Sequence, residues 1–183
     1  MNSIGKLKLK GKLLLFADDA ALIYEEDAQL ENMMNQDLNI VANWFASNKL
    51  RLNANKTNYM YFRKAAWSKV DLNIKIAEQI IIKVDSTKYL GLNLDECIDW
   101  SIHINNLLPK LRATSRLMYR NRKLLDYNVK KMIYYAYFHS NAIYLCTIWG
   151  LAKRELITKV QVLQNGIIKN MLDVSRRYST TQI

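Results

Sequence analysis

Two adjacent aspartates near the start of the chain, Asp18 and Asp19, are the residues best suited to chemistry. Hard cations such as Mg²⁺ take carboxylate oxygens as ligands, and proteins bind this ion through one or two carboxylates together with the phosphates of a substrate. Paired acids also occur in ordinary surface turns. The pair by itself therefore leaves open a metal site and a plain acidic hairpin.

The sequence around the pair predicts a β-hairpin with both acids at its tip. Residues 6–16 alternate lysine with leucine or glycine and then continue as an apolar run, and residues 20–24 form a second apolar run. Aspartate favours turns and is a poor strand residue. Because neighbours in a strand point to opposite faces, one acid would aim into a site and the other would lie beside it.

The segments that follow must position this hairpin. Helical periodicity covers residues 28–47, with Asp27 as the expected N-cap. Residues 59–62 and 70–94 return to strand patterns, with a turn expected near residues 77–79. These patterns predict a small antiparallel sheet with one packed helix.

From Trp100 onward the pattern is helical. Helices are expected over residues 101–125, 128–149 and 154–173. Pro109 is expected to mark a kink or a fresh start in the first of them. The composition therefore predicts an α+β fold with two domains, residues 1–97 and residues 98–183.

A surplus of positive charge points to a polyanionic partner. The chain has 27 lysines and arginines against 16 acids, a formal net charge of +11. Arg112, Arg116 and Arg120 share one helix face, where like charges repel by roughly 0.2–0.5 kcal/mol per pair. A nucleic-acid backbone would turn this repulsion into attraction by releasing counterions. The alternative is a solvated basic face on a helix whose other side is core.

Other functional classes receive less support. Residues 132–152 carry no charge and are long enough to span a bilayer, but His139 and scattered tyrosines favour a buried helix. Cys97 and Cys146 have neither zinc spacing nor a disulfide framework, so free thiols are expected. The apolar run before Asp18 is too short for a signal peptide, so we expect a protein of the nucleus or cytoplasm that is not secreted.

Residues 15–20, Leu-Phe-Ala-Asp-Asp-Ala, resemble the aromatic-Ala-Asp-Asp motif of reverse-transcriptase palms, and later motifs are similar to those of non-LTR retrotransposons. These later motifs follow in register and extend the resemblance over about residues 11–172: Leu50-Arg51-Leu52-Asn53, Lys56-Thr57, Lys88-Tyr89-Leu90-Gly91, Ala136-Tyr137-Phe138-His139-Ser140, Trp149-Gly150 and Leu163-Gln164-Asn165. The family usually has glycine where Leu145 stands.

The resemblance implies a partial polymerase palm followed by an all-helical, thumb-like region. Asp18 and Asp19 would be catalytic and would hold Mg²⁺, Tyr89-Leu90-Gly91 would grip the primer end, and Lys56 would lie near the nucleotide phosphates. An RNA template with a DNA primer, or an RNA–DNA duplex, is the implied partner, with no small-molecule cofactor beyond the metal and deoxynucleotides. Five basic residues would contact this nucleic acid: Lys110, Arg112, Arg116, Arg120 and Lys123.

The family's two-metal site uses a third carboxylate from an earlier palm strand. Only 17 residues precede Asp18, and none is acidic. We therefore expect this piece to be inactive alone, with the other half of the polymerase encoded upstream. Two alternatives remain: a non-catalytic basic module that binds nucleic acid, and a membrane-associated structural protein.

Overall fold

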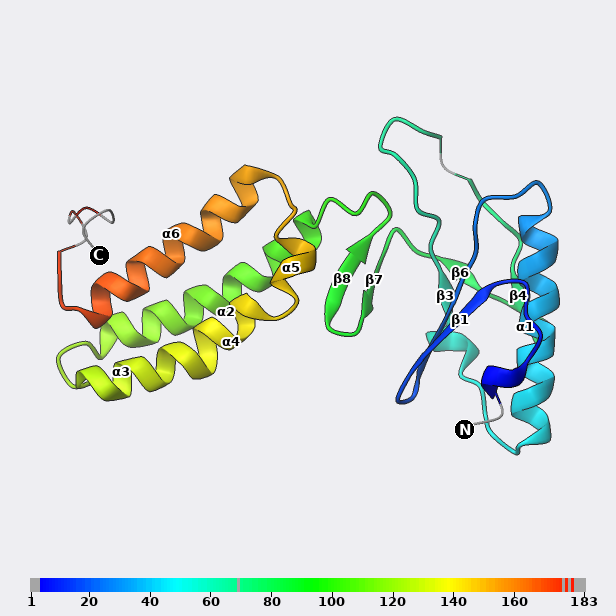
Figure 1. The fold of residues 1–183 in the computed structure, drawn as a ribbon, viewed down its shortest axis with the longest axis horizontal. Helices are drawn as coiled ribbons and strands as arrows, with labels where there is room; N and C mark the ends of the chain where they lie inside the picture. The colour runs from blue at the N-terminus through cyan, green and yellow to red at the C-terminus, as the bar shows by residue number, and fades with distance from the viewer. Residues whose placement is uncertain (1–3, 69, 176, 178, 180–183) are drawn as a thin grey trace. The chain divides into compact units, whose positions relative to one another are not determined.

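The computed structural model describes residues 4–68, 70–175, 177 and 179, and the chain divides into two compact units. The first unit comprises residues 1–85 and the second comprises residues 86–183. Figure 1 labels their helices and strands. The division lies before the expected boundary between residues 97 and 98, because the strands of residues 86–95 pack with the helices that follow them.

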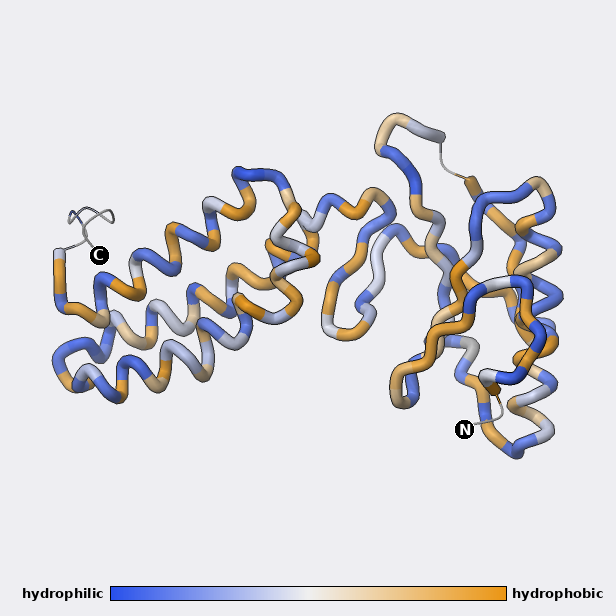
Figure 2. Tube along the Cα trace, viewed as in Figure 1, coloured by the Kyte–Doolittle hydropathy of each residue, from blue (hydrophilic) through white to orange (hydrophobic). Residues whose placement is uncertain are grey.

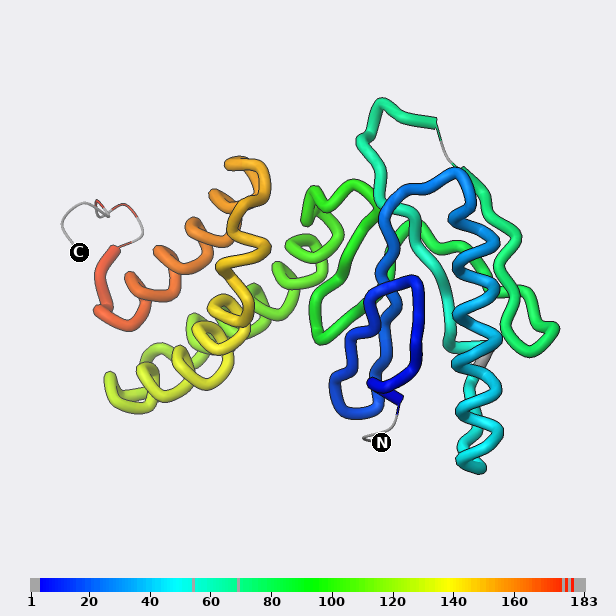
Figure 3. Tube along the Cα trace, turned by 45° about the vertical axis from the view of Figure 1, so that its right-hand side comes forward, coloured from blue at the N-terminus to red at the C-terminus, as the bar shows by residue number. Residues whose placement is uncertain are grey.

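The first unit places one long helix against short strands (Figures 1 and 3). Ile74, Ile76 and Ile81 form its small buried core, and Met34 and Leu38 of the helix pack against them. Its elements are η1 (Ile4–Lys6), β1 (Lys12–Phe16), β2 (Asp19–Ile23), α1 (Leu30–Ser47), η2 (Ala54–Lys56), β3 (Asn58–Tyr59), β4 (Lys75–Ile76), β5 (Gln79–Ile80) and β6 (Ile82–Lys83).

The strands of the described residues pair as four two-stranded sheets, so the α+β class is confirmed but the expected antiparallel sheet is only partly right. β1–β2, β4–β5 and β7–β8 are antiparallel, whereas β3 and β6 pair in parallel. The turn expected near residues 77–79 joins β4 to β5 and has Ala77 and Glu78 at positive φ. Positive φ at both central residues matches the right-handed twist of a hairpin.

Several sequence-based boundaries in the first unit are wrong. The strand expected over residues 59–62 covers only Asn58–Tyr59, because β6, its parallel partner, is itself only two residues long. β1 begins at Lys12 rather than at residue 6, because the N–H groups of Lys10 and Gly11 bind the carboxylate of Asp37 instead of a strand. α1 begins at Leu30 with Gln29 as its N-cap. Asp27 forms the turn before the helix, where its Oδ1 accepts a 2.7 Å hydrogen bond from the Gln29 N–H.

The second unit is built around one central helix. α2 contacts α6, α3, η3, α4 and β8, and Figure 1 shows α2 between α6 and the α3–α4 segment. Its core contains Ile104, Leu108, Leu111, Phe138 and Ile167. Its elements are β7 (Ser86–Tyr89), β8 (Leu92–Asp95), α2 (Ser101–Arg120), α3 (Tyr127–Ile133), the π-helical η3 (Tyr134–His139), α4 (Ser140–Ile143), α5 (Cys146–Trp149) and α6 (Arg154–Met171).

The first helix of this unit is shorter than expected and continues through its proline. α2 ends at Arg120 rather than at residue 125. Pro109 lies inside α2, so a fresh start there is wrong. Proline in a helix interior costs about 3 kcal/mol. Burial of Leu107, Leu108 and Leu111 on the same helix offsets that cost.

The helix expected over residues 128–149 is divided by a break at Leu145. Leu145 has φ 49° and ψ 30°, the left-handed conformation, and α5 starts after it. This conformation crowds Cβ against the backbone, which explains why glycine suits the position. Gly150 ends α5 as its C-cap.

The apolar segment of residues 132–152 presents one face to the core and another to solvent. Tyr134, Phe138 and Trp149 are buried, whereas Met132 and Leu151 are 70% and 85% exposed. The expected buried helix is therefore confirmed for one face only. Among the described residues, no helix is both long enough and apolar enough to cross a membrane.

Replacing Leu145 tests the backbone strain at this break. Leu145→Ala and Leu145→Gly both lose the leucine packing, but only glycine relieves the left-handed conformation. We expect Leu145→Gly to be more stable than Leu145→Ala by about 1 kcal/mol in urea unfolding followed by tryptophan fluorescence. The matched pair at Ile143, the last residue of α4, should show the usual order with alanine more stable. If Leu145→Ala has the same free energy of unfolding as Leu145→Gly, the backbone at residue 145 is not strained.

Candidate metal-binding hairpin and nucleic-acid surface

The paired acids lie at the apex of the β1–β2 hairpin, as the sequence predicts. Phe16 pairs with Asp19 across the strands, so Ala17 and Asp18 form a two-residue loop and Asp19 begins β2. Ala17 has φ 52°, which a tight hairpin loop requires. Both aspartates are exposed. Figure 2 shows the contrast between the polar apex and the apolar strands of this hairpin.

The base of the same hairpin is tied to α1 by a buried carboxylate that sequence reasoning missed. Asp37 is 1% exposed. Its Oδ2 accepts hydrogen bonds from the N–H of Lys10 (2.9 Å), the N–H of Gly11 (2.8 Å) and the hydroxyl of Tyr24 (3.2 Å). Because Lys10 and Gly11 precede β1 and Tyr24 follows β2, one side chain holds both ends of the hairpin.

The surroundings of Asp37 are adapted to this contact. Burial and the neighbouring charge of Asp37 raise the pKa of the Tyr24 hydroxyl well above its usual range, so Tyr24 stays protonated and donates. Gly11 leaves room for the tyrosine, since a Cβ there would lie 2.5 Å from its Cε1. The sequence held one signal: Asp37 is spaced three from Met34 and four from Val41, within the apolar stripe of α1.

The aspartates could hold a hard cation only together with other ligands. Carboxylate oxygens suit Mg²⁺, which keeps several waters or takes substrate phosphates when only one or two carboxylates are available. Within the described part of the chain, no group of three or more histidines, cysteines or acids is placed to hold a metal ion. Asp18 and Asp19 therefore fit Mg²⁺ as a partial ligand set.

Lys56, the expected nucleotide-phosphate contact, is exposed at the end of η2 in the same unit. Its backbone N–H donates to the carbonyl of Asn53 at 3.0 Å, and the hydroxyl of Thr57 donates to the same carbonyl. These bonds fix the loop that presents Lys56. Its role toward a nucleotide stays a prediction.

Tyr89, Leu90 and Gly91 form the tip of the β7–β8 hairpin. Leu90 and Gly91 make its two-residue turn, with φ values of 46° and 83°. The hydroxyl of Tyr144 donates a 2.8 Å hydrogen bond to the Leu90 carbonyl, which links the turn to the end of α4. A Cβ at Gly91 would lie 3.0 Å from Cε1 of Tyr144, so both conformation and space favour glycine.

A second buried carboxylate connects this hairpin to α2. Asp95, the last residue of β8, is 6% exposed. It accepts hydrogen bonds from the N–H groups of Cys97, Asp99 and Trp100 at 3.1–3.2 Å. These bonds fix the loop between β8 and α2, where Ile98 and Trp100 have positive φ. The hairpin is therefore held at a defined place beside the helix.

The expected basic residues of α2 lie on more than one side of the helix. Arg112, Arg116 and Arg120 are exposed on one face. Lys110 is also exposed, but it projects from nearly the opposite side of α2 to Arg112. Residues two apart in a helix differ in direction about the helix axis by about 200°. Lys123 is exposed in the turn after α2.

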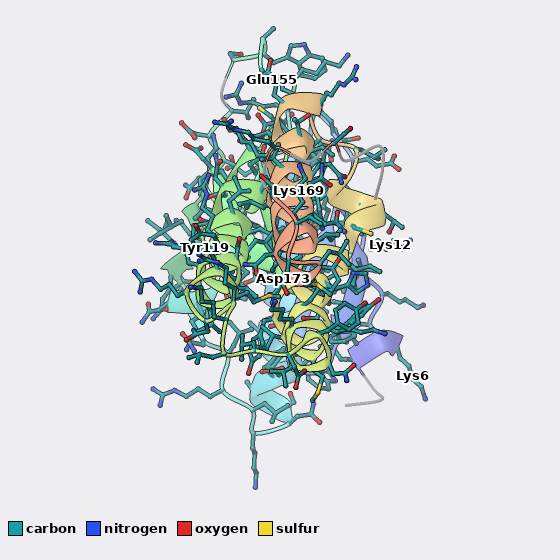
Figure 4. All side chains as sticks on the ribbon, turned by 90° about the vertical axis from the view of Figure 1, so that its left-hand side faces the viewer. Lys6, Lys12, Tyr119, Glu155, Lys169 and Asp173 are labelled. Atoms are coloured by element: carbon teal, nitrogen blue, oxygen red, sulfur yellow. The ribbon has the colours of Figure 1, made fainter. Side chains whose placement is uncertain are left out.

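Lys130 shows that basic residues here also serve the fold. It is 1% exposed, and its Nζ lies 2.7 Å from Oδ1 of Asp173 and donates to the carbonyl of Asn170. Figure 4 labels Asp173 beyond α6. Lys130 therefore joins α3 to the end of α6. Cys97 and Cys146 are free thiols, as expected, and both are partly buried.

The first 94 residues match a known family, and most of the chain has curated relatives. Residues 1–94 match the sequence profile described as reverse transcriptase (RNA-dependent DNA polymerase). The chain is 27% identical over 176 residues to the probable RNA-directed DNA polymerase from transposon BS of Drosophila melanogaster, covering 90% of this chain and 19% of that protein.

Two further relatives show the same pattern. Identity is 27% over 165 residues to the probable RNA-directed DNA polymerase from transposon X-element of Drosophila melanogaster, covering 87% of this chain and 18% of the relative. The chain is 25% identical over 171 residues to the RNA-directed DNA polymerase from mobile element jockey of Drosophila funebris. This match covers 88% of this chain and 18% of that protein. The chain thus spans about a fifth of the length of these relatives. No solved structure matches it significantly.

Asp37→Asn tests the tie between hairpin and helix. The substitution keeps the shape but replaces one acceptor oxygen with an amide that cannot accept the N–H of Lys10 or Gly11. We expect the free energy of unfolding to fall by about 2 kcal/mol and hydrogen exchange of the β1 and β2 amides to accelerate. Asp71→Asn, the same change at an exposed carboxylate paired with Lys83, should cost less than about 1 kcal/mol. Equal losses in the two variants contradict the proposed tie.

Proposed function

This chain belongs to the reverse transcriptase family, and we propose that it forms the later palm and the thumb of a non-LTR retrotransposon RNA-directed DNA polymerase. Residues 1–97 would be the partial palm and residues 98–183 the helical thumb and connection region. The nucleus or cytoplasm, where template and primer are found, is the corresponding location.

The observation that carries this proposal is the presentation of two exposed acids at the apex of a hairpin whose base is fixed by Asp37. A carboxylate that binds a metal must be held in position while remaining accessible to substrate. Exposure of Asp18 and Asp19 leaves their oxygens free for a cation and its phosphate ligands. Bound metal ions would polarise the phosphoryl oxygens and stabilise the attacking and leaving oxygens of nucleotide transfer.

The other proposed contacts with nucleic acid and nucleotide involve exposed residues of both units. The turn Leu90-Gly91 would place its backbone against the primer end, because Gly91 carries no side chain and Tyr144 holds the turn. Arg112, Arg116 and Arg120 would bind the phosphates of the template–primer duplex. Lys56 would approach the phosphates of the incoming nucleotide.

We infer that these 183 residues do not polymerise by themselves. A two-metal site in this family needs a third carboxylate, and the described residues bring no third acid to the aspartate pair. The third acid would have to be supplied by other polypeptide.

A non-catalytic nucleic-acid-binding module is the second candidate. The exposed arginine face of α2 favours it, because that face needs neither the aspartates nor a metal. The two candidates differ in what the aspartates do. Loss of both carboxylates leaves a simple binding module unchanged but removes the chemistry of a polymerase.

The arginine face can be tested by charge removal. Arg112→Gln, Arg116→Gln and Arg120→Gln together should weaken binding of a fluorescent RNA–DNA duplex and lower the salt slope, d log K/d log[salt], by about 3. The triple variant should be at least as stable as the parent, since repulsion along α2 is relieved.

The matched control for this test removes three exposed lysines from the first unit: Lys6→Gln, Lys8→Gln and Lys75→Gln. Lys6 extends away from the ribbon in Figure 4. Equal charge loss there should change the slope much less. An equal effect in both variants would show that net charge, rather than the α2 face, governs binding.

The catalytic role of the aspartates can be tested in a chimera in which this chain replaces the matching segment of the transposon BS polymerase. Primer extension should fall at least roughly 100-fold with Asp18→Asn and Asp19→Asn, since metal placement contributes several kcal/mol to phosphoryl transfer. Glu25→Gln with Glu26→Gln, a neighbouring pair of exposed acids, should leave extension within about two-fold. The 183-residue chain alone should extend no primer. Extension by the isolated chain would refute its inactivity, and an active asparagine chimera would refute the metal role.

A further inference from the structure

A buried histidine of α2 is hydrogen-bonded to the backbone of the β7–β8 hairpin. His103 is 7% exposed, and its Nδ1 accepts the backbone N–H of Asn93 at 3.3 Å. In an antiparallel ribbon, the N–H groups of alternate residue pairs point away from the partner strand. His103 therefore satisfies an outward-facing N–H on the side of β8 that packs against α2. A backbone donor left unpaired at such a packed position would destabilise the contact.

Two tryptophans hold the imidazole in this orientation. The ring centroid of His103 lies 6.5 Å from that of Trp100, with an interplanar angle of 84°, and 5.9 Å from that of Trp149, with an angle of 42°. Trp149 is itself fixed, because its indole N–H donates a 2.8 Å hydrogen bond to the carbonyl of Tyr144. The ring of His103 is thus packed between the start of α2 and α5, with its Nδ1 directed at β8.

Only the neutral imidazole can accept this hydrogen bond. A neutral histidine has one N–H donor and one acceptor nitrogen, whereas both nitrogens are donors after protonation. Since Nδ1 accepts from Asn93, the proton of the neutral ring lies on Nε2. A second proton would place an N–H of His103 against the N–H of Asn93. Burial, and then the positive charge of Lys110, lower the pKa of His103 below its usual 6.5, so the ring is neutral at pH 7.

His103 also lines a basic pocket through which a proton can reach it. The pocket has a volume of about 410 Å³ and is bounded by the β7–β8 hairpin, α2 and the η3–α4 region. Its charged lining residues are Lys88 and Lys110. Every lining residue belongs to residues 86–183, so the pocket is formed by one compact unit. The imidazole can therefore titrate without unfolding of this unit.

The groups around His103 oppose its protonation. The two lysines of the pocket are positive, and like charges repel. The carboxylates of Asp95 and Asp99 are directed at backbone N–H groups of the loop before α2 and the first turn of that helix. The titratable groups on the hairpin, the following loop, α2, α4 and α5 near His103 are Lys88, Asp95, Asp99, Lys110, Tyr144 and Cys146.

We propose that His103 is a positioning residue for the β7–β8 hairpin, held against α2 by the neutral imidazole and released when the imidazole is protonated. The positioning rests on the contact between α2 and β8 alone. Its consequence for a primer end held at Leu90-Gly91 rests on the proposed function, and the hairpin should then support primer extension only where His103 is neutral.

The direction of the pH dependence follows from the lowered pKa. Above pH 6.5 the imidazole is neutral whether the hairpin is attached or detached, so the contact has its full strength. As the pH falls from 6.5 toward the lower pKa of the attached state, the detached state binds the proton first. Within this window the contact weakens by up to about ten-fold per pH unit.

The test follows the full chain by NMR from about pH 8 to about pH 5. At pH 7, nitrogen-15 spectra should show the His103 ring protonated on Nε2 only. The hydrogen-exchange protection of the Asn93 amide, corrected for its intrinsic exchange rate, should be constant above pH 6.5 and fall several-fold below it.

Three variants separate the acceptor from the titration. His103→Asn keeps an acceptor at the same place, because Oδ1 of asparagine, like Nδ1 of histidine, is bonded to Cγ. Its Asn93 protection should stay within about three-fold of the parent at pH 7 and lose the pH dependence. His103→Leu has no acceptor, so its protection should be about ten-fold lower at every pH. His139→Asn, which replaces the other of the two histidines in the chain, should keep the response of the parent.

The outcomes separate this inference from the proposed function. A His103 ring protonated on Nδ1 at pH 7, or Asn93 protection that does not change with pH, overturns the inference without use of any variant. A fall in protection that persists in His103→Asn overturns it as well. In the transposon BS chimera, primer extension should decline more steeply below pH 6.5 with His103 than with His103→Asn. If the exchange results are as expected but the two extension profiles coincide, positioning by His103 stands and the primer role of the hairpin fails.

Discussion

Buried carboxylates that accept backbone N–H groups are the constraint on which both candidate surfaces depend. Asp37 fixes the ends of the β1–β2 hairpin to α1, and Asp95 fixes the loop that joins β8 to α2. Each buried acid is satisfied by several donors, so the cost of removing its charge from water is repaid locally. A two-stranded ribbon alone is marginal in water, and these contacts give each ribbon a defined position.

The two anchored hairpins support different surfaces. In the first unit the anchored base lets the apex carry Asp18 and Asp19 in an exposed position, where a cation and phosphates can reach them. In the second unit the anchored hairpin forms one wall of a basic pocket, closed by the bond from Tyr144 to Leu90. Both surfaces therefore combine an anchored support with accessible polar side chains.

Different faces of α2 have three different roles. Leu108 and Leu111 are buried in the core, His103 and Lys110 line the pocket, and Arg116 lies on the exposed arginine face. This division explains why the helix continues through Pro109, since its packing exceeds the cost of one proline. It also shows why a count of basic residues is a poor guide to a binding surface: Lys130, close in sequence, is buried against Asp173.

The sequence by itself determined the α+β class, the hairpin with Asp18 and Asp19 at its apex, the α1 and α6 helices and the relationship to reverse transcriptases, because periodicity, turn residues and short motifs are local signals. Only the tertiary structure revealed the roles of Asp37 and Asp95, the parallel pairing of β3 with β6 and the break at Leu145. Each of these depends on partners distant in the chain or on backbone angles imposed by packing. From the sequence alone, an aspartate within an apolar helix stripe has no evident partner. The tertiary structure shows which backbone N–H groups satisfy it.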